Sequence, residues 1–565
     1  PEILFVETEA INRPYYIPND PQYNQQWFLD QIKADEAWDL WDPLNGDLPG
    51  HPDVLLASVD TGVDWDHPDL RNSIWNNLGE DLNGNGQTII QSGNSWILDP
   101  GDVNGIDDDG NGFIDDLIGW DLSGTIGIPD NNPTPKPNVN TGGTWAHGTH
   151  VAGLLNVTTD NNTGISSTAF NCRVMCVKSS VEEDNPEVLI TDGYDGILYA
   201  AKAGYYAGSF AIINCSWGSN QFSVTGQTTI EVAHDQYNAV IVAAGGNGDD
   251  EGWGDDYSEH YPSSYEHVVS VAPLGQNDSW GHWATYHESI DISAPGEGIR
   301  STKIGTQYVN WSGSSMASPI VASTIGLLKS LQPDWGNDQI ATMVIETADP
   351  VLYQVNSELY LQGNLGKGRV DVLSALTTPL LPKITFVDLD IFLPDGEDND
   401  IQAGETAYIS MILWNEDDWG DAVDVVLYLD SETAGISISN QEVYLGDIPS
   451  GEIGINFEMP FFVEFAAWMD EGQAEFTLDI TSYHTETMIY QNSIQFTVDV
   501  YEIPPLMGDV NWDGLINISD VVLIVQIILA GGQADEDTME VADLDGNQVI
   551  NLLDIVNLIN IILGE

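Results

Sequence analysis

Three segments of the sequence carry residue types that together could perform nucleophilic catalysis. An apolar run ends in the carboxylate of Asp60, and His147 opens a helical pattern. Ser315 stands in the first turn of an apolar helix, where free N–H groups and a partial positive charge favour a developing oxyanion. A carboxylate can hold a histidine in one tautomer, and that histidine can take the proton from a serine hydroxyl. These residues are therefore predicted to form a catalytic set.

The elements that must position these residues alternate in type from residue 20 to about residue 377. Short β-branched or apolar runs are expected as strands at 54–60, 173–177, 211–216, 239–243 and 268–271, with helices after His147, Asp192, Thr228 and Ser315 and from Asn337. This alternation predicts a doubly wound α/β fold with a mainly parallel sheet. In such sheets the chemistry gathers at the carboxyl ends of the strands.

At these motifs the chain resembles the subtilisin-like serine proteases. The resemblance covers about residues 20–377 and rests on Asp60-Thr-Gly-Val-Asp64, His147-Gly-Thr-His-Val-Ala-Gly153 and Gly313-Ser-Ser315-Met-Ala-Ser-Pro319. It implies that Asp60 orients the histidine, that His147 is general base and then general acid, and that Ser315 is the acylated nucleophile. His150 is expected to be a packing residue. Ser314 stands where the family often has Thr.

Two further segments fit the same resemblance. Asn247 follows an apolar run and two glycines, and the family likeness implies that its side-chain amide donates to the oxyanion beside the Ser315 N–H. Without that context, an Asn after glycines is an ordinary turn residue. Ser216, Trp217 and Gly218 resemble the edge segment that pairs with the substrate backbone, which suits an endopeptidase of broad reach.

An insertion at about residues 78–143 contains a candidate calcium loop. Oxygen-bearing side chains at alternate positions, with glycines between them, are typical of an EF-hand-like loop, and the expected ligands are Asp107, Asp109, Asn111 and Asp115. Position 12 is Ile118, so Asp116 or a distant residue must replace the usual acid. The alternative is a solvated acidic loop. The family's structural calcium site is implied separately at Asp20, Asp69 and Asn161.

The last 58 residues contain an internal duplication of a second calcium-loop pattern. Each copy has oxygen ligands at positions 1, 3, 5, 9 and 12 and runs into an apolar helix; the ligands are Asp509, Asn511, Asp513, Asn517 and Asp520, then Asp543, Asp545, Asn547, Asn551 and Asp554. This resembles a dockerin, the calcium-dependent module that binds cohesin domains. The second copy has Gln548 where calcium loops usually place Gly. A purely structural calcium clasp is the alternative.

The charge balance limits the classes of partner. Thirteen Lys and Arg against 89 Asp and Glu give a formal net charge of −76, so little is available to neutralise phosphate, and nucleic acid or anionic membranes are unlikely partners. Such a surface repels itself unless salt screens it or divalent cations bind it, which favours a saline or calcium-containing medium. No apolar run is long enough to span a membrane, and the start at Pro1 suggests a processed product.

The pattern of the chain predicts four parts. Residues 1–19 resemble the tail of a subtilase prosegment, 20–377 form the catalytic domain, 383–503 have the period-two strands of a β-sandwich, and 506–565 form the dockerin-like module. We therefore expect a secreted, calcium-stabilised serine endopeptidase tethered by its C-terminal module. The alternatives are a catalytically silent protease-like binding or surface-assembly protein and a self-inhibited zymogen. The presence of every catalytic residue and of Asn247 argues against the silent protein.

Overall fold

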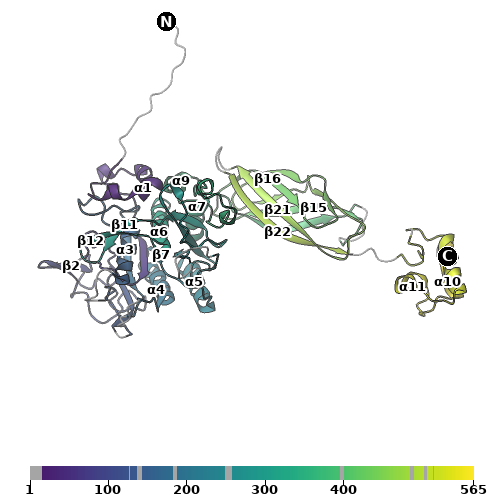
Figure 1. Cartoon of the computed structure of the whole chain (residues 1–565), viewed down its shortest axis with the longest axis horizontal. Coiled ribbons are helices and arrows are strands. Elements are labelled where there is room, and N and C mark those ends of the chain that lie inside the picture. Colours follow the sequence, from purple (N-terminus) through teal and green to yellow (C-terminus); the bar gives the residue numbers. More distant parts are fainter. Residues whose placement is uncertain are drawn as a thin grey trace, which may run out of the picture. The chain divides into compact units, whose positions relative to one another are not determined.

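The computed structural model of the chain describes residues 16–125, 127–136, 143–181, 188–248, 257–394, 400–483, 489–501, 506–512 and 514–564. The chain forms two compact units that divide after Pro379 (Figure 1). The finer boundaries predicted near residues 377, 383, 503 and 506 remain predictions, and most of the segment 1–19 lies outside the described residues.

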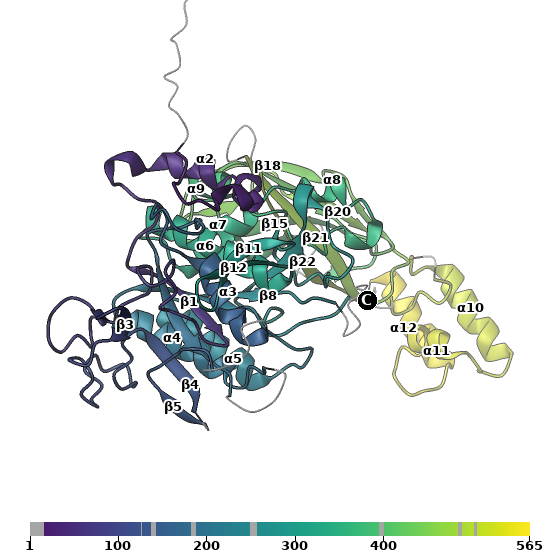
Figure 2. The same cartoon turned by 60° about the vertical axis from the view of Figure 1, so that its left-hand side comes forward.

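The first unit is built on an eight-stranded sheet in the order β10-β9-β8-β7-β1-β6-β4-β5. The pairing is parallel throughout except between β4 and β5, which form one edge of the sheet (Figure 2). The strands are β1 (Val54–Asp60), β4 (Gly119–Thr125), β5 (Ile128–Asp130), β6 (Arg173–Lys178), β7 (Phe210–Cys215), β8 (Val240–Ala244), β9 (Val268–Leu274) and β10 (Ile292–Pro295). Because β1, β7 and β8 are buried along their whole length, they appear in the sequence as continuous apolar runs.

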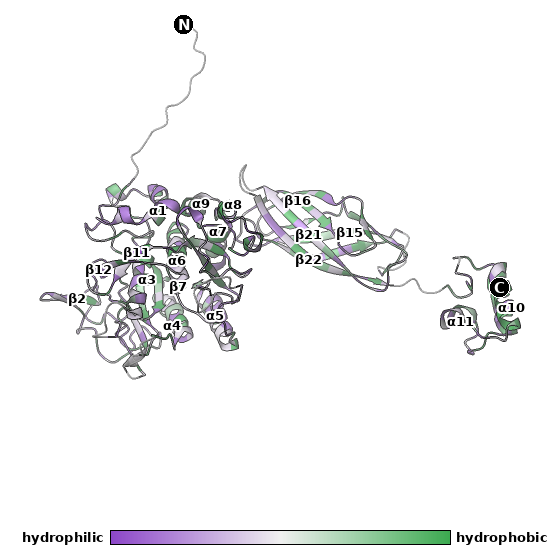
Figure 3. Ribbon diagram, in the orientation of Figure 1, coloured by the Kyte–Doolittle hydropathy of each residue, from purple (hydrophilic) through white to green (hydrophobic). Residues whose placement is uncertain are grey.

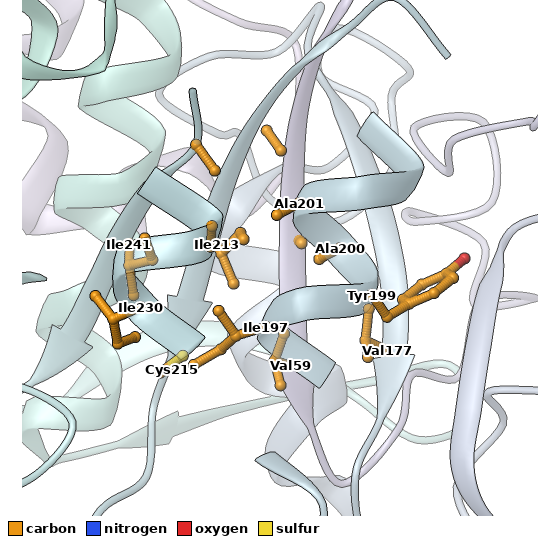
Figure 4. Close-up of a cluster of buried hydrophobic side chains, with 14 of the residues drawn as sticks. Val59, Val177, Ile197, Tyr199, Ala200, Ala201, Ile213, Cys215, Ile230 and Ile241 are labelled. Carbon is orange, nitrogen blue, oxygen red and sulfur yellow. The ribbon is translucent and has the colours of Figure 1, made fainter. Parts of the chain in front are cut away.

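Helices cover both faces of this sheet. On one face Val59 and Ile213 pack against α4 (Gly193–Tyr206) and α5 (Val224–Tyr237), as Figure 4 shows. The neighbouring Leu56 points the other way, toward α6 (Ser314–Leu331), where a Cβ on Gly326 would lie 2.9 Å from Leu56 Cδ2. The helix α3 (His147–Leu155) packs against β1 and α6. The predicted doubly wound α/β fold is thereby confirmed.

Shorter elements complete the first unit. The hairpin of β11 (Ile299–Lys303) and β12 (Gln307–Trp311) leads directly into α6 and so carries the chain to Ser315. The others are α1 (Trp27–Gln31), α2 (Ala34–Ala37), α7 (Asn337–Glu346), α8 (Leu352–Val355), α9 (Val372–Thr377), the hairpin of β2 (Ile89–Ser92) and β3 (Ser95–Leu98), and 3-10 helices at Tyr23–Gln25, Trp38–Leu40, Pro43–Asn45, Thr144–Ala146, Gln276–Asp278 and Leu359–Leu361.

The second unit begins with two mainly antiparallel sheets that share one core. One sheet has the strand order β13-β15-β20-β17, and β19 also pairs with β15. The other sheet has the strand order β14-β22-β21-β16-β18. Inward residues of both, such as Met411 and Leu478, belong to one buried cluster, while hydrophilic and hydrophobic residues alternate along the strands (Figure 3). The strands are β13 (Ile384–Phe392), β14 (Ile401–Gln402), β15 (Thr406–Asn415), β16 (Ala422–Asp430), β17 (Ile436–Ile438), β18 (Glu442–Ile448), β19 (Ile453–Ile455), β20 (Phe461–Phe465), β21 (Gly472–Tyr483) and β22 (Ile489–Tyr501).

A small helical module ends the chain. It contains α10 (Ile518–Leu529), α11 (Glu536–Ala542) and α12 (Leu552–Leu563), which share a core that includes Val510, Ile524 and Leu558. The duplicated loops cap these helices, because Asn517 and Asn551 are the N-cap residues of α10 and α12 and form capping boxes with the acids three residues later. No helix among the described residues is long and apolar enough to cross a membrane.

Candidate active site

The aspartate and the histidine of the predicted catalytic set are in direct contact. Asp60 ends β1 and His147 begins α3, so the carboxyl end of a central strand faces a helix start. The Nδ1 atom of His147 lies 2.8 Å from Asp60 Oδ1 and 3.0 Å from Oδ2. The N–H of Thr61 also donates to Asp60 Oδ1, at 2.7 Å. The Asp60 side chain is 1% exposed and that of His147 is 24% exposed, so the pair is buried on the aspartate side and open on the other.

The electrostatics of this pair favour a cationic histidine. Burial alone would lower the pKa of His147, but the charge of Asp60 and its hydrogen bond more than offset that effect, and the pKa of His147 is raised. A carboxylate on Nδ1 keeps that nitrogen protonated and leaves Nε2 as the basic atom. The pair can therefore accept a proton at Nε2 and hold it as an imidazolium.

Ser315 is the second residue of α6, where the N–H groups have no acceptor within the helix. Its Oγ donates to the carbonyl oxygen of Ser216 at 3.2 Å; within the described chain it forms no hydrogen bond with His147. The hydroxyl must therefore turn from Ser216 toward Nε2 before it can be deprotonated. Such contacts are often loose without substrate.

Asn247 lies beside Ser314 and the predicted nucleophile Ser315, in the loop after β8. Its Oδ1 accepts the backbone N–H of Ser314 at 2.8 Å and the Ser314 hydroxyl at 2.9 Å. The same hydroxyl accepts the N–H of Gly246 at 3.3 Å. With Oδ1 fixed by Ser314, the Nδ2 of Asn247 has no hydrogen-bond partner among the described residues and is left as a donor. Ser314 is 1% exposed and orients Asn247, a role that sequence reasoning did not assign to it.

The segment predicted to bind substrate is tied to the same helix start. The Oγ of Ser216 donates to the carbonyl oxygen of Ser315 at 2.9 Å, and Ser216 in turn accepts from Asn214 Nδ2 at 2.9 Å. Asn214 Oδ1 accepts the hydroxyl of Ser318 at 2.5 Å, which links the end of β7 to α6. Trp217 Nε1 donates to the carbonyl oxygen of Val59 at 2.8 Å. Asn214 opens the segment that was predicted to bind substrate, but its bond to Ser318 was not predicted, because the two residues are 104 positions apart.

The edge residue Gly218 lies next to His260. A Cβ on Gly218 would lie 2.3 Å from a ring carbon of His260, so only glycine fits there without movement. The following residue, Ser219, forms an antiparallel bridge with Tyr261. The assignment of Ser216, Trp217 and Gly218 to substrate binding stays a prediction.

His150 is the second histidine of the helical motif. Its ring stacks on Trp311, with centroids 4.6 Å apart and planes at 17°, and its Nε2 contacts the carbonyl oxygen of Val309. Burial lowers the pKa of His150 to about 3, so this ring is neutral and enclosed. The arrangement matches the packing role expected for it.

The residues of the predicted family calcium site come together. Asp20 accepts the N–H groups of Asp160 and Asn161, and Asp69 accepts Asn161 Nδ2 at 2.8 Å. The pKa of Asp69 is raised to about 6, mainly by burial, and the charge of Asp20 contributes to that rise. Gly164 closes the loop with φ +54, and a Cβ there would lie 2.1 Å from Asp69 Oδ2. Buried carboxylates of this kind fit a cation, and the ligand assignment remains a prediction.

The loop predicted as EF-hand-like is only partly assembled as expected. Asp107 accepts the N–H groups of Gly110 and Gly112 and lies beside Asp109, whose pKa is raised mainly by burial. Asn111 Nδ2 donates to Asp109 Oδ2 at 2.9 Å. Asp115 faces elsewhere, because its carboxylate accepts the N–H groups of residues 104 and 105. The structure places Asp116 and the more distant Glu80 beside Asp109 instead.

In the C-terminal module the second predicted loop gathers three carboxylates. Oxygen atoms of Asp543, Asp545 and Asp554 lie within 4.8 Å of one another, and Asn547 donates its N–H to Asp545 Oδ1. Gln548 adopts φ +64, the left-handed conformation that position 6 requires. Asn551 caps the helix that follows.

The first predicted loop has the same plan. Asp509 accepts the N–H of Gly514 at 2.7 Å, and the buried Asp520 accepts the N–H groups of Asn511 and Asn517. Asp513 lies outside the described residues. Both loops therefore fit a hard cation with oxygen ligands.

The fold and this site define a class of hydrolase with an Asp–His pair and a helix-start serine at the carboxyl edge of a parallel sheet. The sequence matches the subtilase family, peptidase S8, over residues 51–368 and the dockerin type I domain over residues 507–563. The chain belongs to the subtilase family and carries a C-terminal dockerin type I domain. Both predicted resemblances are confirmed.

Several known proteases are similar to the first unit. Thermitase from Thermoactinomyces vulgaris is 30% identical over 337 residues, which are 60% of this chain and 93% of thermitase. A thermophilic serine proteinase from Bacillus sp. (strain AK1) is 28% identical over 352 residues, 62% of this chain and 69% of that protein. Halolysin from Haloferax mediterranei is 28% identical over 381 residues, 67% of this chain and 58% of halolysin. The chain is a subtilisin-like serine endopeptidase.

Proposed function

We propose that the protein is a secreted, calcium-stabilised endopeptidase that cleaves peptide bonds with Asp60, His147 and Ser315 and is held to a partner by its dockerin domain. The observation that carries the catalytic part is the contact of 2.8 Å between His147 Nδ1 and Asp60, with Ser315 and Asn247 together at the start of α6. A silent protease-like protein would have no need to keep all four groups.

The proposed reaction starts when the Ser315 hydroxyl leaves the Ser216 carbonyl and donates to His147 Nε2. As Oγ attacks the scissile carbonyl, its proton passes to Nε2, and the Asp60 carboxylate stabilises the imidazolium. Asn247 Nδ2 and the Ser315 backbone N–H then donate hydrogen bonds to the oxyanion. His147 then gives its proton to the leaving amine, and water activated by the same nitrogen hydrolyses the acyl-enzyme.

The acidic loops support the calcium part of the proposal. Dockerin type I domains bind calcium, and subtilases usually do so as well. In this chain the predicted ligands are clustered carboxylates, and at Asp69 burial has raised the pKa, so the anionic form is unfavourable without a cation. A cation bound only by the folded chain stabilises it by mass action.

The dockerin domain supports the tethering part of the proposal. Dockerins bind cohesin partners, so residues 506–565 would anchor the peptidase to an assembly or cell surface outside the cell. The formal charge of −76 suits a saline medium, where self-repulsion is screened. A pull-down with immobilised cohesin, in calcium and in EDTA, tests this part separately from catalysis.

Labelling with a fluorophosphonate probe in calcium-containing buffer tests the catalytic proposal. The wild-type chain should be labelled at Ser315, and Ser315→Ala should abolish labelling. Ser314→Ala is the matched comparison: it removes the adjacent hydroxyl and keeps Ser315, so it should still be labelled, but more slowly, because Asn247 loses one of its two contacts. Absence of labelling in a folded wild-type chain would favour the silent, surface-assembly alternative.

A further inference from the structure

Three carboxylates from separate parts of the 78–143 insertion meet in one place. Glu80, Asp109 and Asp116 each have an oxygen within 4.8 Å of an oxygen of the other two. Glu80 and Asp116 are 0% exposed. We propose that these three residues bind one calcium ion, and that this ion fastens the insertion to α4. The proposal gives a ligand set to the calcium dependence proposed above, and its test does not require peptidase activity.

The negative charge of this cluster is not balanced by the protein. Within the described part of the chain, none of the three carboxylates forms an ion pair with Lys or Arg. Burial, followed by repulsion from neighbouring acids, raises the pKa of Glu80 to about 7. Buried charges in proteins are paired or coordinate a metal. A divalent cation among the three carboxylates supplies the missing charge.

One carboxylate oxygen of the cluster has no hydrogen-bond partner among the residues that the structure describes. Glu80 Oε1 accepts the N–H groups of Asp108 at 2.9 Å and Asp109 at 3.3 Å. These bonds fix the direction of the side chain, and the second oxygen, Oε2, is buried without a hydrogen-bond partner. Because unsatisfied carboxylate oxygens are rare in protein interiors, each needs an explanation. An ion bound by Glu80 accounts for this one.

The remaining contacts hold the carboxylates in place around the cluster. Asn77 Nδ2 donates to Asp109 at 2.9 Å and to Asp116 at 3.0 Å, and Asn111 Nδ2 donates to the same two residues. Tyr199 Oη donates to Asp116 Oδ2 at 2.7 Å. Hydrogen bonds of this kind orient the ligands of a metal site. The donor set consists of oxygen atoms, and three carboxylates in one small group favour Ca²⁺ over Mg²⁺, which usually takes one or two.

Tyr199 connects the cluster to the core of the catalytic unit. It lies on α4 and belongs to the buried cluster between α4, α5 and the sheet. Glu80 and Asp109 lie in the insertion, so an ion that binds both of them and Asp116 joins the insertion to α4 through the Tyr199–Asp116 bond. Loss of the ion should therefore loosen the insertion first.

Calcium counting on the full-length chain tests the proposal. After EDTA treatment and dialysis against calcium, Glu80→Gln and Asp116→Asn should each bind one ion fewer per chain than the wild type. Glu358→Gln is the matched control, because it makes the same change at an exposed residue of the same unit. Equal counts in the wild type and in folded Glu80→Gln would overturn the proposal. Fluorophosphonate labelling of the same samples reports catalysis independently.

Melting curves add a signature that a solvated acidic loop would not give. In EDTA, Glu80→Gln should melt above the wild type, because it removes one of three mutually repelling buried carboxylates. In calcium the order should reverse, because the variant has lost a ligand. The same order in both buffers would contradict the proposal.

A measurement on the wild type keeps the test decisive if the variants do not fold. Crystals soaked in terbium, which replaces calcium, should give an anomalous peak between Glu80, Asp109 and Asp116. A well-ordered insertion without such a peak would refute the site.

Discussion

Replacement of Ser314, the residue before the proposed nucleophile Ser315, by alanine should lower kcat about two- to tenfold without unfolding the protein. The Ser314 hydroxyl donates to Asn247 Oδ1 at 2.9 Å and accepts the N–H of Gly246 at 3.3 Å. The backbone N–H of Ser314 holds the same Oδ1 at 2.8 Å. Ser314→Ala therefore keeps one of the contacts that orient Asn247 and removes the other.

The magnitude follows from the bonds that are lost. A neutral hydrogen bond contributes about 0.5–1.5 kcal/mol net, and about 1.4 kcal/mol is tenfold in rate. Only the bond to Asn247 acts on the proposed oxyanion donor, so we expect a loss of about two- to tenfold in kcat for Ser314→Ala. Asn247→Ala removes the donor itself, and removal of one such donor from a subtilisin costs about a hundred- to a thousandfold. KM should change little in both variants, because the contact forms in the transition state.

The assay is steady-state hydrolysis of a chromogenic peptide by the wild type, Ser314→Ala, Ser314→Thr and Asn247→Ala, with active sites counted by fluorophosphonate labelling. Ser314→Thr keeps the hydroxyl and should stay near the wild-type kcat. Melting curves show whether loss of the buried hydroxyl has unfolded any variant. The reasoning is refuted if Ser314→Ala keeps the wild-type kcat, or if Ser314→Thr is as impaired as Ser314→Ala.

Three further predictions concern pH and calcium. Because Asp60 raises the pKa of His147, kcat/KM should fall as the pH drops through that raised pKa. Asp60→Asn should move the acid limb of the pH–rate profile to lower pH and reduce kcat by about ten-thousandfold. An acid limb that does not move would contradict the assigned pair. Gln548→Gly should tighten calcium binding by the second dockerin loop about fivefold, since a non-glycine residue at φ +64 costs roughly 1 kcal/mol. Calorimetric titration measures the calcium affinity, and an unchanged affinity would contradict the prediction. In EDTA the protein should lose stability as the pH rises from about 4 to 6, because folding raises the pKa of Asp69 from 3.8 to about 6 and the folded state binds the extra proton in that window. Saturating calcium should remove this pH dependence and add about 2.7 kcal/mol per site at a hundredfold excess over Kd. Identical denaturation curves in EDTA and in calcium would exclude this prediction.

The parallel sheet was largely predictable because its strands are buried on both faces. The expected strand 54–60 coincides with β1, and 211–216 differs from β7 by one residue at each end. The strands β4 and β5 were not predicted, because Gly, Asp and Ser interrupt the apolar pattern of β4, and β5 is only the short segment Ile-Pro-Asp. The helix expected after Thr228 begins earlier, at Val224, where Ser223 accepts the N–H of Gly226 as an N-cap. Local capping therefore set a boundary that periodicity alone did not.

The proposed catalytic residues could be picked out from the sequence because each stands in a short motif at the end of a strand or the start of a helix. Residues that act through long-range contacts gave no such signal. Glu80 is 29 residues from Asp109, and it lies just before, not within, the weaker calcium-loop pattern at Asp81, Asn83 and Asn85. Asn214 and Ser318 are 104 residues apart. Only the fold brings such pairs together, so spacing along the chain could not reveal them.

The acidic composition and the fold are linked through these buried carboxylates. An exposed carboxylate is solvated and contributes little beyond solubility, but Asp69, Glu80 and Asp116 are enclosed, and burial raises the pKa of each. Without a cation, the folded chain must either leave these groups charged in a poorly solvating interior or take up protons, and both make folding less favourable near neutral pH. Under the proposed assignment, calcium would reverse the sign of this contribution, because each buried carboxylate would become a ligand. The same residues that destabilise the metal-free chain should therefore stabilise the calcium-bound one, and the proposed ions would then make the stability of the peptidase depend on a calcium-containing medium.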